Sequence, residues 1–185
     1  MSLLIVAAMK EEAAEISRLT DHEVLITGIG TVPATIALTK RLAQGPLPER
    51  VVNVGTAGAL ADVAPGVYEI TAAVKHDHKV LRVGGLTDFV YPRVFEFETV
   101  TDLPTARLAT GDTFVNTTEL RTELARESEL VDMEGYCLAA VCSEFGVPLT
   151  LLKQVSDNAD ETSNVSWPES LAAAAVQLNE AVAAL

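Results

Sequence analysis

Three acidic residues, Glu12, Glu134 and Asp157, each come soon after an apolar run that is typical of a buried strand. Ligands of open α/β sheets bind beyond the carboxyl ends of the strands, so these carboxylates are expected to meet in one crevice. Carboxylates held close together raise one another's pKa, which suits them to general acid and base chemistry. Each acid alone also fits a helix start or a loop cap, and only their coincidence indicates a site.

The apolar runs that predict strands are short and rich in branched residues. They are Leu3–Ala8, Val24–Thr27, Val51–Val54, Val67–Val74, a stretch around Lys79–Val83, Ala106–Ala109, Leu130–Met133 and Leu149–Val155. Helical spacing of apolar residues lies between several of them. Examples are the set Met9, Ala13 and Ile16, the set Ala34, Leu38 and Leu42, and the C-terminal segment Leu171–Leu185.

Two segments resemble capping boxes and predict helix starts: Ser166–Glu169, which contains Pro168, and Asn116–Glu119. Strands that alternate with helices favour a parallel sheet between helical layers. Residues 67–100 lack a helical pattern, so the sheet is expected to be mixed there. We therefore predict one domain over residues 1–185, a three-layer αβα sandwich with a mixed, mostly parallel twisted sheet.

The composition excludes several classes of partner. The formal net charge is −13 and no cluster of Lys and Arg occurs, which argues against nucleic acid and against an anionic membrane surface. Cys137 and Cys142 are too few for a disulfide framework and poorly spaced for zinc, so we expect buried thiols. The apolar start is too short for a signal peptide, and a cytoplasmic location is predicted.

Three further motifs are incomplete or absent, so the sequence predicts no dinucleotide cofactor, no metal site and no serine nucleophile. Gly28-Ile29-Gly30 suggests a dinucleotide fingerprint, but Pro33 occupies the third glycine position and no acid ends the strand near Val54, so we expect a tight turn. His76 and His78 would share a strand face, but no third metal ligand is near them. No G-x-S-x-G nucleophile elbow occurs.

Six segments resemble, in order, motifs of the purine nucleoside phosphorylase/hydrolase superfamily, and most of all its 5'-methylthioadenosine/S-adenosylhomocysteine nucleosidases. They are Ala7–Glu12, Gly28–Gly30, Asn53–Gly58, Gly111–Asn116, Val131–Glu134 and Val155–Asp157. The resemblance implies the fold predicted above, a purine nucleoside as substrate, and a homodimer.

The resemblance also implies the catalytic roles. Glu12 would orient and deprotonate the attacking water. Asp157, steadied by Ser156, would protonate the leaving purine. Glu134 would hold the ribose hydroxyls, with Met133 packed beside the sugar. The physical logic agrees, since cleavage of an N-glycosidic bond passes through an oxocarbenium-like sugar stabilised by negative charge, while the departing base needs a proton.

The remaining site residues follow from the same resemblance. Phe114 would stack on the base, and the backbone of Val115 would hydrogen-bond to the edge of the base. Thr56, Ala57 and Gly58 would line the pocket beneath the ribose. No cofactor or metal is implied.

Hydrolysis and phosphorolysis differ in whether the site can hold an anion. Phosphorylases of this superfamily place arginines in the loop after the first strand, where they can bind phosphate. In this chain the only basic residue of Met9–Ser17 is Lys10, and Arg50 precedes its strand, at the end away from the expected site. We therefore expect a nucleosidase acting on a 5'-modified adenosine such as methylthioadenosine or adenosylhomocysteine. A phosphorylase and a catalytically silent nucleoside-binding protein are the alternatives. The chain is short between His78 and Asp112, which leaves the 5' group open, and Lys153 stands where these nucleosidases commonly carry an arginine.

Overall fold

Runs of branched apolar residues form most of the strands in the computed structural model, which describes residues 2–19, 21–77 and 92–185. The strands are β1 (Leu3–Ala7), β2 (Glu23–Ile26), β3 (Arg50–Ala59), β4 (Val67–Lys75), β5 (Val94–Glu96), β6 (Thr105–Thr110), β7 (Leu130–Asp132) and β8 (Leu149–Asp157). The helices are α1 (Ala14–Leu19), α2 (Thr31–Gln44), α3 (Thr118–Leu124), α4 (Gly135–Phe145) and α5 (Ser163–Val182).

The sheet is mixed and mostly parallel, as predicted. β1 pairs in parallel with β2 and β3, β3 with β8, and β6 with β4 and β7. The pairs β3–β7, β4–β5 and β4–β8 are antiparallel. Because β8 joins β3 to β4, the strands β3, β7, β6, β4 and β8 close into a ring that the sequence pattern did not predict.

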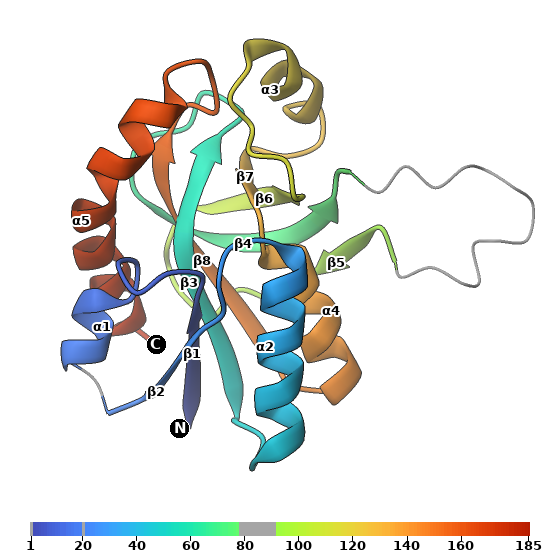
Figure 1. Ribbon diagram of the computed structural model, residues 1–185, viewed down its shortest axis with the longest axis vertical. Helices are drawn as coiled ribbons and strands as arrows, with labels where there is room; N and C mark the ends of the chain where they lie inside the picture. Colours follow the sequence, from blue (N-terminus) through green and yellow to red (C-terminus); the bar gives the residue numbers. More distant parts are fainter. Residues whose placement is uncertain (1, 20, 78–91) are drawn as a thin grey trace, which may run out of the picture.

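Helices cover the sheet on two sides, which confirms the predicted layers (Figure 1). On one side α2 packs beside α4, and its residues Ala34, Leu38 and Leu42 are buried as their spacing predicted. On the other side α1 packs beside α5. Within the described ranges, no helix is both long and apolar enough to cross a bilayer.

Two strands extend beyond their predicted ends, and this changes where the site residues lie. β3 continues through Gly55–Ala59 and β8 through Ser156 and Asp157, because the two strands pair along this whole length. The small residues of β3 carry no strand signature in the sequence, but they let side chains of other segments lie close to this strand. Thr56, Ala57, Gly58 and Asp157 therefore lie in strands, not in the loops that the apolar runs indicated.

Two predicted helix starts need correction. α5 begins at Ser163 with Thr162 as its N-cap residue, so the predicted helix start at Ser166–Glu169 is wrong and Pro168 lies inside the helix. At the start of the helix, the Asp160 N–H donates to Ser163 Oγ at 3.0 Å. α3 begins one residue later than its box indicated, with the Thr117 hydroxyl accepting from the Leu120 N–H.

Predictions for the segment before α1 and for the sheet around β4 can also be compared with the structure. Met9 lies well before α1, so the helical face predicted to join Met9, Ala13 and Ile16 is wrong for Met9, whereas Ala13, directly before α1, and Ile16 are both buried in the same core cluster. The antiparallel pair of β4 and β5 agrees with the predicted mixed region. The predicted strand around Lys79–Val83, and His78 of the possible metal pair, lie outside the described residues.

Candidate active site

A cavity of about 360 Å³ opens beyond the carboxyl ends of β1, β6, β7 and β8, and its wall includes the end of β3. All ten residues that the sequence selected line it: Glu12, Thr56, Ala57, Gly58, Phe114, Val115, Met133, Glu134, Ser156 and Asp157. The structure therefore brings the selected side chains together, while their chemical roles stay predictions.

Glu12 is buried and held at both carboxylate oxygens. Oε1 accepts the Thr56 N–H at 2.9 Å and the Thr56 hydroxyl at 3.2 Å, and Oε2 accepts the Met9 N–H at 3.1 Å. A Cβ at Gly55 would lie 3.3 Å from Glu12 Oε1, so the small residue makes room for the carboxylate. Because its donors come mostly from backbone, the carboxylate has a fixed orientation, as a base that must position a water requires.

Asp157 ends β8 and is also held at both oxygens. Oδ2 accepts the Ser156 hydroxyl at 2.7 Å, and Oδ1 accepts the Ala159 N–H at 2.8 Å. A Cβ at Gly58 would lie 3.1 Å from Asp157 Oδ1 and 3.0 Å from the Ala159 Cβ. Glycine at position 58 is therefore what lets β3 pass this carboxyl group so closely.

Glu134 precedes α4 and reaches the start of α2. Its Oε1 accepts the N–H of Gly30, the N-cap residue of α2, at 2.7 Å. Burial, reinforced by the negative charge of Asp132, raises the pKa of Glu134 to about 7 although Lys153 and the Gly30 N–H act in the opposite direction. Glu134 therefore changes its charge near neutral pH.

The loop Gly28–Gly30, which the sequence presented as a tight turn, thus positions a site carboxylate. Gly28 and Gly30 have φ of 86° and 99°, values that favour glycine. α2 has no side-chain cap of its own, and Asp112 supplies one from a distance, accepting the Thr31 N–H at 2.7 Å. Two acids from other segments, Glu134 and Asp112, therefore sit at the N-terminus of α2, where the helix dipole favours negative charge.

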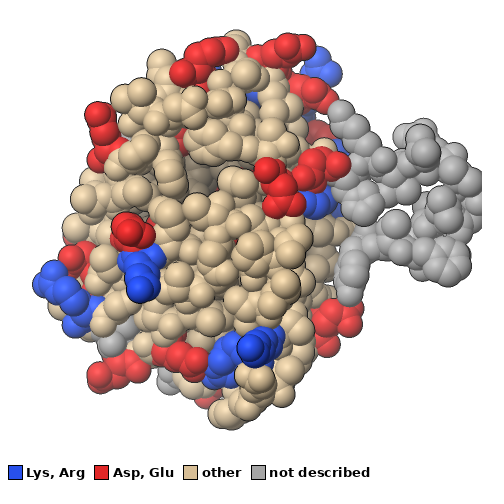
Figure 2. Space-filling view, in the orientation of Figure 1, with Lys and Arg blue, Asp and Glu red and all other residues tan. Residues whose placement is uncertain are grey.

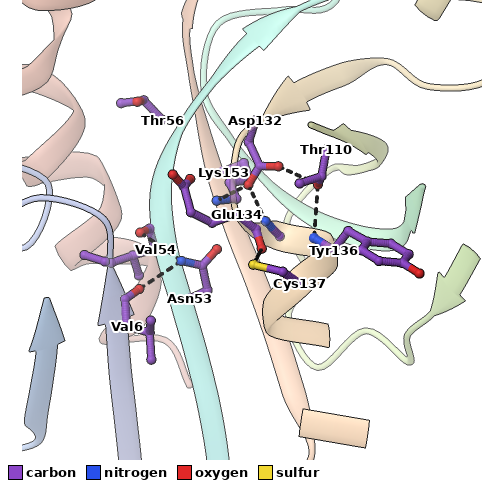
Figure 3. Close-up of polar contacts among 12 residues, drawn as sticks. Val6, Asn53, Val54, Thr56, Thr110, Asp132, Glu134, Tyr136, Cys137 and Lys153 are labelled. Atoms are coloured by element: carbon purple, nitrogen blue, oxygen red, sulfur yellow. Dashed lines mark hydrogen bonds and ion pairs between the residues drawn. The ribbon is translucent and has the colours of Figure 1, made fainter. Parts of the chain in front are cut away.

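A buried ion pair, which the sequence reasoning did not predict, joins Asp132 of the cavity wall to Lys153. Lys153 Nζ lies 2.9 Å from Asp132 Oδ2, and both side chains are 1% exposed. Asp132 also accepts the Thr110 hydroxyl at 2.6 Å and the Gly135 N–H at 2.8 Å (Figure 3). Burial alone would lower the pKa of Lys153, but Asp132 and Glu134 raise it above its ordinary value, so the lysine stays charged.

The mouth of the cavity is aromatic. Phe114 is 38% exposed, and its ring lies 6.2 Å from that of Trp167 in an edge-to-face arrangement. Val115 is buried beneath it. An exposed ring beside a cavity gives a flat base a surface to stack on.

Sequence reasoning missed several residues of the wall. They are Ala8, Ile29, Thr113, Val131, Asp132, Asn164, Trp167 and Pro168, and Met9 was assigned to a helix face. Asp132 carried a signal, since an acid within a buried apolar run needs a partner. Trp167 gave none, because the capping-box pattern placed it at a helix start.

Among the residues that the structure describes, none of those that line the cavity is Lys or Arg. In the part of the chain that the structure describes, no three metal-ligating side chains converge. His76 is half-buried beside Gly111, whose absent Cβ would lie 2.3 Å from His76 Nε2. Burial lowers the pKa of His76, which indicates a packed neutral imidazole. Cys137 and Cys142 are buried thiols, as predicted, and burial raises the pKa of each to about 12.

This geometry can be set beside that of known proteins. The family model described as Phosphorylase superfamily matches residues 3–185. The chain belongs to the phosphorylase superfamily. A 5'-methylthioadenosine/S-adenosylhomocysteine nucleosidase of Shewanella sediminis is 31% identical over 83% of this chain and 76% of its own length. An aminodeoxyfutalosine nucleosidase of Helicobacter pylori is 45% identical over 62 residues, which cover 32% of this chain and 27% of that protein.

A solved structure agrees in fold with this member of the superfamily. The 5'-methylthioadenosine/S-adenosyl homocysteine nucleosidase of Helicobacter pylori superposes with a TM-score of 0.84 at 25% identity, over 99% of this chain and 96% of that one. The relatives are nucleosidases, which are N-ribosyl hydrolases, and the chain is an enzyme of that class. The resemblance seen in the sequence is thereby confirmed.

Proposed function

We propose that this superfamily member hydrolyses the N-glycosidic bond of a 5'-modified adenosine-type nucleoside, such as methylthioadenosine or adenosylhomocysteine. The products would be the free base and a ribose derivative. The observation that carries the proposal is that Glu12, Glu134 and Asp157, delivered by three separate segments, line one cavity. Nucleosidases among the relatives support the reaction type.

Glu134 and Glu12 would act on the sugar. The ionised carboxylate of Glu134 would accept hydrogen bonds from the ribose hydroxyls, and both acids would stabilise the positive charge that develops on the sugar as the bond to the base breaks. Glu12 would take a proton from the water while the water oxygen bonds to C1' of the ribose. The fixed hydrogen bonds of Glu12 support this, because they leave its direction unchanged during the reaction.

Asp157 would act on the base. Its proton would pass to a purine ring nitrogen as the electrons of the glycosidic bond move onto the base. The Ser156 hydroxyl and the Ala159 N–H hold the carboxyl group in place. Phe114 would cover one face of the purine, since its ring is exposed at the mouth.

Water is the better nucleophile in this cavity than phosphate. Phosphate binding needs cationic donors, and no Lys or Arg of the described ranges lines the cavity. Lys153, which interacts with Glu134 and Glu12, is already paired with Asp132 and buried. Three carboxylates in the wall would in addition repel an anion.

We propose methylthioadenosine or adenosylhomocysteine as substrate on the strength of the Shewanella relative, which matches most of this chain. The apolar wall residues Ile29 and Met9 support a thioether 5' substituent, which both of these nucleosides carry. The local match to the aminodeoxyfutalosine nucleosidase makes a futalosine-type nucleoside the second candidate.

We propose a homodimer and a cytoplasmic location. The dimer is supported by three exposed apolar residues at the start of α2, namely Ile29 (49% exposed), Val32 (63%) and Ile36 (61%). Charged side chains are sparse on the surface over α2, apart from basic ones at its lower end (Figure 2). Free thiols at Cys137 and Cys142 support a reducing compartment. Light scattering of purified protein would give a single-chain mass if the dimer proposal is wrong.

The substrate proposal is tested by chromatography of free base released from methylthioadenosine, adenosylhomocysteine, adenosine and aminodeoxyfutalosine. We expect release from the 5'-modified adenosines, and a loss of at least a hundredfold in Asp157→Asn with an unchanged circular dichroism spectrum. Absence of base release from every nucleoside by the wild-type protein would contradict the proposed reaction.

A further inference from the structure

The indole of Trp167 is connected to Glu12 by two consecutive hydrogen bonds. Trp167 Nε1 lies 3.0 Å from Thr56 Oγ1, and Thr56 Oγ1 lies 3.2 Å from Glu12 Oε1. The first residue belongs to α5, the second to β3, and the third follows β1. The connection therefore joins three segments that are far apart in the sequence.

Chemistry fixes the direction of both hydrogen bonds. The indole N–H can only donate, so Thr56 Oγ1 accepts from it. The carboxylate of Glu12 can only accept when ionised, so the single hydrogen of the Thr56 hydroxyl points at Glu12. With a lone pair bound to Trp167, the hydroxyl cannot rotate without losing a partner.

The result is an asymmetric Glu12 carboxylate. Oε1 receives two donors, the N–H and the hydroxyl of Thr56, whereas Oε2 receives only the Met9 N–H. A carboxylate oxygen has about two lone-pair sites, so among the described residues Oε1 is saturated and Oε2 keeps one site open. Oε2 is the atom with room to accept a proton.

Trp167 also touches the part of the cavity that faces a base. Its ring meets Phe114 edge to face, with ring planes at 63°. One side chain of α5 therefore contacts the aromatic mouth and, through Thr56, the acid at the other side of the cavity.

We propose that Trp167 is a positioning residue for catalysis: its N–H orients the Thr56 hydroxyl, which holds Glu12 so that Oε2 faces the attacking water. The inference rests on the proposed function. In that reaction the water oxygen bonds to C1', the water proton goes to Glu12 Oε2, the bond between C1' and the base breaks, and Asp157 gives its proton to the base.

Kinetics of Trp167→Phe test the proposal, because phenylalanine keeps an aromatic ring next to Phe114 and removes the N–H. We expect kcat to fall about fivefold, the range of one neutral hydrogen bond, with KM within twofold of the wild type. Thr56→Val should lose at least as much and Thr56→Ser should restore most of it. In the Thr56→Val background, Trp167→Phe should cost nothing further.

The matched control is Tyr68→Phe, which removes a different side-chain hydrogen bond, to the Ala64 carbonyl oxygen, outside the cavity wall. It should leave kcat and KM unchanged. A Trp167→Phe variant with wild-type kcat would overturn the proposal. So would losses that multiply in the double variant, because independent effects would then account for them.

A second readout does not depend on turnover. Trp167 is the only tryptophan of the chain, so an amide-proton NMR spectrum contains one indole resonance. We expect this resonance to exchange slowly with solvent, and to shift and exchange faster in Thr56→Val. A resonance unaffected by Thr56→Val would overturn the hydrogen-bond connection. A wild-type protein with the expected resonance and no base release would instead contradict the proposed function alone.

Discussion

Lys153 and Asp132 form an ion pair of 2.9 Å in which both side chains are 1% exposed, and Asp132 lines the cavity of the candidate active site. Lys153 lies on β8, which pairs with both β3 and β4, so the pair stands where the ring of strands closes. Lys153 Nζ therefore supplies the counter-charge for the Asp132 carboxylate, which is buried beside Glu134.

Lys153→Met should lower the free energy of unfolding by about 3 kcal/mol or more, because it leaves the Asp132 charge buried without a counter-ion. The double variant Lys153→Met/Asp132→Asn should be more stable than Lys153→Met alone. Urea denaturation measures both. The control is Arg18→Ala, which breaks an exposed pair with Glu15 and should change stability by about 0.5 kcal/mol or less. Wild-type stability of Lys153→Met would refute the interpretation.

Nucleoside binding should weaken as the pH falls through 7. Because burial raises the pKa of Glu134 to about 7, its carboxylate is ionised above that pH and protonated below it. The ionised form accepts the ribose hydroxyl hydrogen bonds more strongly than the protonated form, so we expect affinity to be about tenfold lower at pH 6 than at pH 8. Calorimetric titration at several pH values measures this. An affinity that is flat across the range would rule out Glu134 as the ribose ligand, and Glu134→Gln should abolish the dependence.

The raised pKa of Glu134 also predicts how the free energy of unfolding varies with pH. The folded protein holds the Glu134 proton up to about pH 7, whereas the unfolded chain releases it near its ordinary value of 4.5. Protonation therefore stabilises the fold below pH 4.5, and this contribution is lost as the pH rises to 7, for a total of about 3 kcal/mol. Relative to the wild type, Glu134→Gln should gain stability between pH 5 and pH 8 in urea denaturation. A difference in the free energy of unfolding between the two proteins that does not change with pH would show that burial does not raise the pKa of Glu134.

Gly58→Ala should reduce base release by at least tenfold, because the added Cβ would lie 3.0 Å from the Ala159 Cβ and 3.1 Å from Asp157 Oδ1. Gly45→Ala is the matched control, since the added Cβ there meets only the flexible end of Arg41. Steady-state rates of both variants provide the measurement. Equal rates would mean that Asp157 tolerates displacement, contrary to its proposed role.

The sequence predicted the layers and the mixed sheet, because apolar runs mark buried strands, and through the family resemblance it identified ten residues that line the cavity. It failed where local pattern and tertiary packing disagree. Gly55–Ala59 carries no strand signature, yet pairing with β8 keeps it extended. The closed ring also escaped prediction, since β8 contacts both β3 and β4, and one-dimensional periodicity contains no information on two partners.

Within the site, the resemblance identified side chains that line the cavity, but it did not identify the residues that hold them in place. It identified Glu12, but the contribution of Trp167 depends on a hydrogen bond between α5 and β3. The capping-box pattern at Ser166–Glu169 pointed to a different role, because local capping was considered without the earlier turn at Asp160. Contacts between distant segments are what a single sequence does not encode visibly.

The most direct test of the account is the initial rate of base release from methylthioadenosine as inorganic phosphate is varied from zero. A cavity with three carboxylates and, in the part of the chain that the structure describes, no lining Lys or Arg predicts a rate that is unchanged by phosphate, with the unphosphorylated sugar as product. A rate that vanishes without phosphate and yields a sugar 1-phosphate would contradict the account.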